Sequence, residues 1–118
     1  MILLDTNVLS ELMKKASNES VLSWLDRITV HRVYTSVITK AEIEYDVLLL
    51  PEGKRKLEIS EAADRIMDLF KGRILPFDSK STQEFARIKS QRKKIGHPIS
   101  YADAQIAAIA LRNGFQLA

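Results

Sequence analysis

Acidic residues occupy four positions in the chain that could support a metal-dependent reaction. Asp5 and Asp78 each follow a short apolar run, and Glu42 and Asp103 lie near the start of segments with apolar residues at helical spacing. Carboxylates are hard oxygen ligands, which suit Mg²⁺ or Mn²⁺ rather than Zn²⁺. The chain has no cysteine and two histidines, which excludes a zinc–thiolate site, a cysteine nucleophile and a histidine-rich metal site.

Apolar runs that alternate with amphipathic segments predict the elements that position these acids. The runs predict strands at 1–4, 32–35, 73–77 and 115–118. The amphipathic segments predict helices at 7–15, 18–28, 37–50, 81–95 and 100–113, and one helix or a helix pair at 52–70. Asn18 is the expected N-cap of the second helix. Strands that alternate with helices indicate an α/β fold with a central parallel sheet. Pro76, near the end of the third strand, suits a position that needs no ladder donor.

The carboxyl ends of parallel strands form the edge where such sheets bind ligands. The polar residues expected at this edge are Asp5, Thr6, Asn7, Ser36, Thr39, Glu42, Asp78 and Asp103. Asp78 follows the third strand, and Asp103 lies in the first turn of the helix before the fourth strand. Position in the sequence does not choose between these two aspartates.

Each acid also has a structural explanation that needs no ligand. Asp5 could be the N-cap of the first helix. Glu42 could form a capping box with Thr39, and Asp103 could form one with Ser100. A carboxylate in a first turn also interacts favourably with the helix dipole. Both interpretations of the acids stay open on these patterns alone.

The charge distribution points to a polyanionic partner. The 118 residues carry a net charge of +3, and the positive excess lies in residues 60–118. Five basic residues gather in the predicted 81–95 helix, namely Arg87, Lys89, Arg92, Lys93 and Lys94. Such a cluster suits the backbone of a nucleic acid, although a solvated helix face has the same composition.

The overall composition predicts one globular domain over residues 1–118. Apolar residues make up 46% of the chain and charged residues 28%. No apolar run approaches the roughly 18 to 20 residues that cross a bilayer, and no basic segment precedes the first strand as in a signal peptide. We therefore expect a cytoplasmic protein with no membrane contact. Because the sequence stops at the fourth strand, we also expect the domain to lack a C-terminal strand.

Five segments together resemble the PIN-domain ribonuclease toxins of the VapC/FitB-like family. They are 1–11 (MILLDTNVLSE), 34–43 (YTSVITKAEI), 50–55 (LPEGKR), 72–78 (GRILPFD) and 99–110 (ISYADAQIAAIA). The resemblance runs through the whole chain in order. It implies a PIN-like α/β/α sandwich with a central parallel sheet of four to five strands. It also implies an endoribonuclease that depends on Mg²⁺ or Mn²⁺ and is the toxin of a bacterial toxin–antitoxin pair.

The resemblance also implies which residues act. The family's three acids match Asp5, Glu42 and Asp103, which would be both the catalytic residues and the metal ligands. Asn7 matches a polar position beside the first acid, and Thr6 is a further supporting polar residue. Asp78 matches a position outside the acidic set, so it is expected to cap the helix that follows. The implied reaction hydrolyses an RNA phosphodiester bond with a metal-bound water, and the implied partners are an antitoxin, operator DNA held through it, and a second copy of the chain.

Two departures from the family pattern bear on activity. The family usually supplies a fourth polar or acidic residue just after the fourth strand, and the sequence ends before that point. The family also commonly has glycine four residues after the second acid, where this chain has Asp46. Asp46 could support the site, although we expect it to distort the helix packing or to have no effect, since a ligand needs both reach and aim.

Two alternatives remain beside an active ribonuclease toxin. The chain could be a weakly active or inactive PIN subunit that acts mainly in an antitoxin-bound, DNA-binding repressor. The other alternative is a phosphotransferase of the haloacid-dehalogenase type, but this class requires Asp-x-Asp after the first strand. Here the third residue of that triplet is Asn7, which argues against this class.

Overall fold

Four parallel strands form the centre of the computed structural model, which describes residues 1–14, 19–29 and 32–118. They are β1 (Ile2–Leu3), β2 (Val33–Ser36), β3 (Ile74–Leu75) and β4 (Gln116–Leu117). Their order across the sheet is β3-β2-β1-β4, and every neighbouring pair is parallel. The predicted parallel α/β fold is therefore confirmed. β3 is an edge strand that Pro76 directly follows, so the missing N–H of the proline costs no ladder hydrogen bond.

The helices connect these strands in sequence order. They are α1 (Thr6–Lys14), α2 (Glu19–Thr29), α3 (Val37–Leu49), α4 (Lys54–Leu69), α5 (Ser81–Lys94) and α6 (Tyr101–Asn113). Their ends agree with the sequence prediction to within two residues. The expected N-cap at Asn18 lies outside the described residues. Gly114 ends α6 in the left-handed conformation (φ 71°) that glycine adopts without steric cost, as its position predicted.

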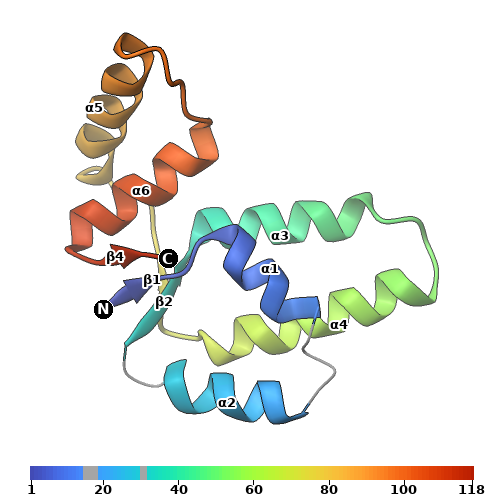
Figure 1. The fold of residues 1–118 in the computed structure, drawn as a ribbon. Coiled ribbons are helices and arrows are strands. Elements are labelled where there is room, and N and C mark those ends of the chain that lie inside the picture. The colour runs from blue at the N-terminus through green and yellow to red at the C-terminus, as the bar shows by residue number, and fades with distance from the viewer. Residues whose placement is uncertain (15–18, 30–31) are drawn as a thin grey trace.

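The sheet is covered on both faces because side chains alternate along each strand. Leu4 and Val33 belong to a core cluster with α1–α4, which includes the fully buried Leu9, Ile66 and Phe70. Leu3 faces the other way and packs against Ile106, Ile109 and Ala110 of α6. Figure 1 shows α1–α4 on one side of the sheet and α5–α6 on the other, so the predicted α/β/α sandwich is confirmed.

The strand order places β1 at the centre of the site considered below. From β1 the chain moves outward to β2 and β3, and it then returns to add β4 on the opposite side of β1. In open α/β sheets, ligands bind at the carboxyl ends of the strands where the strand order reverses in this way. Asp5 lies at that point, and its N–H donates to the carbonyl of Ala118, 2.7 Å away, at the end of β4.

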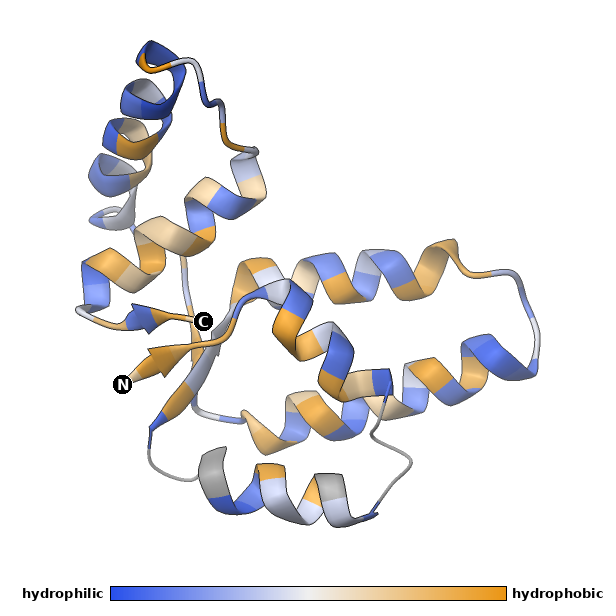
Figure 2. Ribbon diagram, in the orientation of Figure 1, coloured by the Kyte–Doolittle hydropathy of each residue, from blue (hydrophilic) through white to orange (hydrophobic). Residues whose placement is uncertain are grey.

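The helices differ in polarity. In Figure 2 apolar segments of α1, α4 and α6 gather around the strands, whereas α5 is largely hydrophilic and lies against α6. α5 can be this polar because α6 separates it from the sheet. Within the described part of the chain, no helix combines the length and the hydropathy needed to cross a bilayer.

Candidate metal and nuclease site

Asp5 joins the end of β1 to the start of α1. One of its carboxylate oxygens accepts a hydrogen bond from the backbone N–H of Val8 at 2.9 Å, and its carbonyl accepts the N–H of Leu9 at 3.2 Å. The predicted role as helix N-cap is therefore confirmed. The capping bond uses one oxygen and fixes the side chain at the strand end. Among the described residues the second oxygen has no hydrogen-bond partner, so the cap does not exclude a ligand role.

Glu42, in the second turn of α3, is held across the sheet edge by α1. The Thr6 hydroxyl lies 2.6 Å from one Glu42 carboxylate oxygen, and it lies 3.1 Å from the Thr39 hydroxyl. Thr6 directly follows Asp5 in the chain. This contact therefore brings two of the three predicted acids to neighbouring positions from segments 36 residues apart.

The start of α3 differs from the prediction. Ser36, the last residue of β2, is the N-cap, and its hydroxyl accepts the backbone N–H of Thr39 at 3.1 Å. A capping box between Thr39 and Glu42 is therefore wrong, because Thr39 lies three residues inside the cap rather than at it. Glu42 loses its main structural explanation, and its contact with Thr6 becomes its defining interaction. A serine at a strand end with threonine three residues later was the signal for this cap.

Asp103 begins α6 on the same edge of the sheet. The Ser100 hydroxyl accepts its backbone N–H at 3.1 Å, which confirms Ser100 as the N-cap. Because β4 runs parallel to β1 and α6 leads back into β4, the first turn of α6 lies on the side where β1 ends. The Asp103 side chain is exposed there. Among the residues that the structure describes, no hydrogen bond or ion pair holds its carboxylate.

The three acids share an edge without forming one ligand cluster. Within residues 1–14, 19–29 and 32–118, no three acidic or histidine side chains are close enough to hold one ion together. Their chemistry still fits a hard divalent cation, because all are carboxylates. Mg²⁺ is usually held by one or two carboxylates, with water and phosphate oxygens completing its shell. The Thr6–Glu42 contact makes Asp5 and Glu42 the candidate pair for such a site, and Asp103 lies on the same edge of the sheet.

The comparisons with known proteins agree with this arrangement. Residues 2–118 match the family model described as the PIN domain. The chain belongs to the PIN-domain family. Over 119 aligned residues it is 44% identical to the toxin FitB of Neisseria gonorrhoeae, covering all of this chain and 86% of that protein. It is 38% identical to the VapC ribonuclease Y4jK of Sinorhizobium fredii, covering all of this chain and 85% of that protein.

Solved structures show the same similarity in three dimensions. The structure of FitAB bound to an IR36 DNA fragment superposes with a TM-score of 0.81 at 44% identity, covering 99% of this chain and 82% of that one. The crystal structure of FitAcB from N. gonorrhoeae gives 0.80 at 44% identity, with coverage of 99% and 85%. The predicted resemblance to VapC/FitB-type toxins is therefore confirmed.

Asp78 has a structural role in this PIN domain. Its carboxylate accepts hydrogen bonds from the backbone N–H and the hydroxyl of Ser81, at 2.9 and 2.8 Å, and so fixes the start of α5. It also lies 3.6 Å from Arg112 of α6. The Ser81 hydroxyl and N–H, with a smaller contribution from the Arg112 charge, hold the pKa of Asp78 below its ordinary value. Asp78 therefore caps the following helix, as predicted.

The two polar residues predicted to support the acids have different surroundings. Asn7 lies exposed in the first turn of α1. Asp46 lies on α3, which continues without a break to Leu49, so the helix backbone is not distorted there. Its side chain lines a groove of about 560 Å³ between α1, α3 and α4, together with Arg55 and Arg65 of α4. Asp46 therefore borders that groove, one turn along α3 from Glu42.

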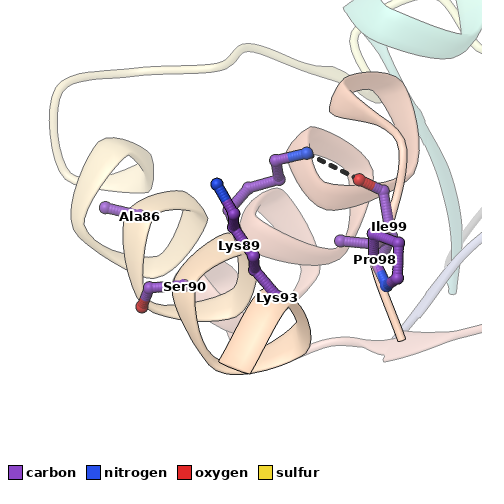
Figure 3. Close-up of a pocket in the computed structure, with 6 residues that line it drawn as sticks. All are labelled: Ala86, Lys89, Ser90, Lys93, Pro98 and Ile99. Carbon is purple, nitrogen blue, oxygen red and sulfur yellow. Dashed lines mark hydrogen bonds between the residues drawn. The ribbon is translucent and has the colours of Figure 1, made fainter. Parts of the chain in front are cut away.

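The basic cluster of the PIN domain divides into two groups. Lys89 donates to the carbonyl of Ile99 at 2.6 Å and lies 4.3 Å from the centre of the Tyr101 ring, while Arg92 donates to the carbonyl of His97 at 2.7 Å. Figure 3 shows the Lys89 bond at a hollow of about 450 Å³ between α5 and residues 98–99. These two side chains fasten the segment between α5 and α6.

The rest of the cluster faces outward. Arg87 forms an ion pair with Glu84 one turn earlier in α5. Lys93 and Lys94 are exposed at the end of the helix, and neither has an ion-pair partner among the described residues. Sequence reasoning treated the five basic residues as one surface, whereas two of them stabilise the helix connection.

Proposed function

We propose that this chain is a metal-dependent endoribonuclease that hydrolyses RNA phosphodiester bonds as the toxin of a bacterial toxin–antitoxin pair. The observation that carries the proposal is the contact between Thr6 and Glu42. It brings the second acid to the strand end that bears Asp5, at the position where the strand order reverses. The similarity to a protein named as a VapC ribonuclease supports the reaction class.

Asp5, Glu42 and Asp103 would hold the Mg²⁺ or Mn²⁺ ion. When bound, such an ion lowers the pKa of a water molecule and polarises a phosphate. Asp5 is fixed by its capping bond and Glu42 by Thr6, so both carboxylates are oriented before a ligand arrives. Asp103 is exposed, so an RNA strand can reach it from solvent. Asn7, exposed in the first turn of α1, is a supporting polar group of this site, whereas Asp46 borders the groove between α1, α3 and α4.

Lys93 and Lys94 are the basic residues best placed to contact the RNA backbone. Both are exposed at the end of α5, where Arg87 adds a third, partly neutralised charge. Lys89 and Arg92 keep their charge and contribute to the field, although their polar atoms already have backbone partners. This part of the proposal concerns affinity for a polyanion and carries no sequence preference.

The partners follow from the relatives and from one exposed surface. FitAB is described as bound to DNA, and we propose that this chain likewise joins a cognate antitoxin, contacts operator DNA only through it, and acts as a homodimer in the cytoplasm. The α3–α4 hairpin exposes the large apolar side chains Tyr45, Leu48, Leu49 and Leu57. Three of these four side chains lie within five residues of α3, and exposed apolar surface of this kind is typical of protein–protein contacts, which supports a protein partner.

A second function is a weakly active subunit that acts mainly in the antitoxin-bound repressor. The observation that favours it is the separation of the acids, no three of which share a ligand cluster within the described residues. If the antitoxin-bound form represses its operator while the isolated chain leaves RNA intact in Mn²⁺, this second function replaces the first.

The test is an RNA cleavage assay of the isolated chain in Mn²⁺, in Mg²⁺ and after chelation by EDTA. We expect cleavage with either ion, none with EDTA, and none from an Asp5→Asn variant whose circular dichroism matches that of the wild type. Asparagine preserves the oxygen that caps α1, so this variant removes the charge and keeps the helix start. Cleavage that survives EDTA, or that Asp5→Asn retains in full, would contradict the proposal.

A further inference from the structure

Three hydroxyl groups form a line that ends at the carboxylate of Glu42. The Ser36 hydroxyl lies 3.4 Å from that of Thr39, which lies 3.1 Å from that of Thr6, which lies 2.6 Å from Glu42. Ser36 and Thr39 are completely buried, and Thr6 is partly buried. The line therefore connects the end of β2, the first turn of α3 and the first turn of α1.

The number of protons on each group determines which hydroxyl donates and which accepts along this line. An ionised carboxylate only accepts hydrogen bonds, and a hydroxyl has one proton to donate. Thr6 has one proton, and with that proton given to Glu42 at the shortest of the three distances, the Thr6 oxygen is able to accept the proton of the Thr39 hydroxyl 3.1 Å away. The Ser36 oxygen already accepts the N–H of Thr39, which leaves its proton free to point toward the Thr39 oxygen. All three hydroxyls then point toward Glu42.

We infer that Thr39 is a positioning residue for the metal site, acting on Glu42 through Thr6. This inference rests on the proposed metal-dependent function. A donor on the far side of Thr6 keeps the Thr6 hydroxyl aimed at one Glu42 oxygen and leaves the other oxygen available to a cation. Because Thr39 is fully buried, no water replaces its hydroxyl when that group is removed.

A purely structural role for Thr39 makes a different prediction. The cap of α3 uses the backbone N–H of Thr39, and any side chain leaves that bond intact. Thr39→Val keeps the shape of the side chain and removes only the hydroxyl. A change in metal binding by this variant therefore reports on the hydroxyl line and does not come from loss of the cap.

Thr35 provides a matched control for burial. It is also completely buried and lies at the same end of β2, but its hydroxyl has no hydrogen-bond partner within the described residues. Thr35→Val makes the same chemical change four residues earlier, outside the line. Thr39→Ser is the conservative variant, because it restores the hydroxyl and loses only the methyl group.

The experiment measures Mn²⁺ affinity without RNA, from the electron paramagnetic resonance signal of free Mn²⁺. Groups that orient a metal ligand typically contribute about 10- to 100-fold in metal affinity. We expect Thr39→Val to weaken binding by about tenfold or more, Thr39→Ser to restore most of the affinity, and Thr35→Val to match the wild type. Thermal unfolding of each variant establishes that the fold is retained.

The outcomes separate this inference from the function on which it rests. If the wild type binds Mn²⁺ and Thr39→Val binds it equally well, the positioning role is overturned and the metal site stands. Equal weakening by Thr39→Val and Thr35→Val would also overturn it, because loss of buried packing would then explain both. If the wild type binds no Mn²⁺, the proposed metal site fails and the positioning role fails with it.

Discussion

The acidic edge of the sheet and the basic helix α5 carry opposite charges and are assembled in opposite ways. The acids Asp5, Glu42 and Asp103 lie far apart in the sequence, and a hydrogen bond between α1 and α3 brings two of them to neighbouring positions. The five basic residues lie within a span of eight positions, 87–94, yet Lys89 and Arg92 bind carbonyls of the segment that follows their own helix. Residues that are close in sequence therefore serve local structure here, and residues that are distant in sequence build the candidate site.

The largest effect is expected from a comparison of Asp103 with Asp78, because the sequence positions of these two aspartates suit a catalytic role equally well. We expect Asp103→Asn to reduce Mn²⁺-dependent RNA cleavage by about 100-fold or more, since it removes a charged ligand from the proposed site. Asp78→Asn should retain cleavage within a few-fold, because Asp78 caps α5. Initial cleavage rates at matched protein concentration measure both. If Asp78→Asn reduced cleavage more than Asp103→Asn, the third catalytic residue would be Asp78.

The division of the basic cluster predicts a change in the salt dependence of RNA binding. Each lost contact between a lysine and a single-stranded phosphate lowers the slope of log affinity against log salt by about 0.7. A Lys93→Ala/Lys94→Ala variant should therefore lower the slope by about 1.4, with Mn²⁺ affinity unchanged. Fluorescence anisotropy with labelled RNA across a salt series measures the slope.

A matched control removes two exposed charges elsewhere on the molecule. Lys54 and Lys71 are exposed and lie outside α5, so a Lys54→Ala/Lys71→Ala variant changes the net charge equally. We expect its slope to stay near the wild-type value. If the wild type and the two double variants gave equal slopes, Lys93 and Lys94 would be ordinary solvent-exposed lysines that do not contact the RNA.

Lys89 and Lys94 are expected to differ in how much each contributes to the free energy of unfolding. Lys89→Met keeps the aliphatic part of the side chain and loses the bond to the Ile99 carbonyl, so we expect it to lower the free energy of unfolding by about 1 kcal/mol. Lys94→Met removes the same charge from an exposed position and should leave stability within about 0.5 kcal/mol. Urea unfolding followed by circular dichroism measures both. A larger loss from Lys94→Met would reverse the assignment.

The smallest expected effect is the contribution of Asp78 to stability at acid pH. Its pKa is lower in the folded chain than in the unfolded one, chiefly because of the Ser81 hydroxyl. The stabilisation is therefore present above the unfolded pKa and is lost as the pH falls through the folded one, below about pH 4. Urea midpoints at pH 6 and pH 3 should differ more for the wild type than for Asp78→Asn. Equal pH sensitivity would mean that this carboxylate does not titrate with folding.

Local patterns predicted the parts of the structure that depend on neighbours in the sequence. The caps at Asp5, Ser100 and Asp78 and the helix end at Gly114 were all predicted, because each involves bonds spanning three or four residues. The one incorrect cap has the same physical origin. Thr39 and Ser36 are both suitable capping residues, and the start of α3 depends on where β2 ends, which the pairing of Ser36 with Leu75 in β3 determines.

The sequence by itself determined the order of strands and helices, the two buried faces and the placement of acids at strand ends. Apolar periodicity and short-range capping carry that information along the chain. Only the tertiary structure decided that β4 returns beside β1, that Thr6 contacts Glu42, and that Lys89 turns inward to the Ile99 carbonyl. These contacts join residues 10 to 115 positions apart, and their formation depends on how whole elements pack, which no local pattern encodes.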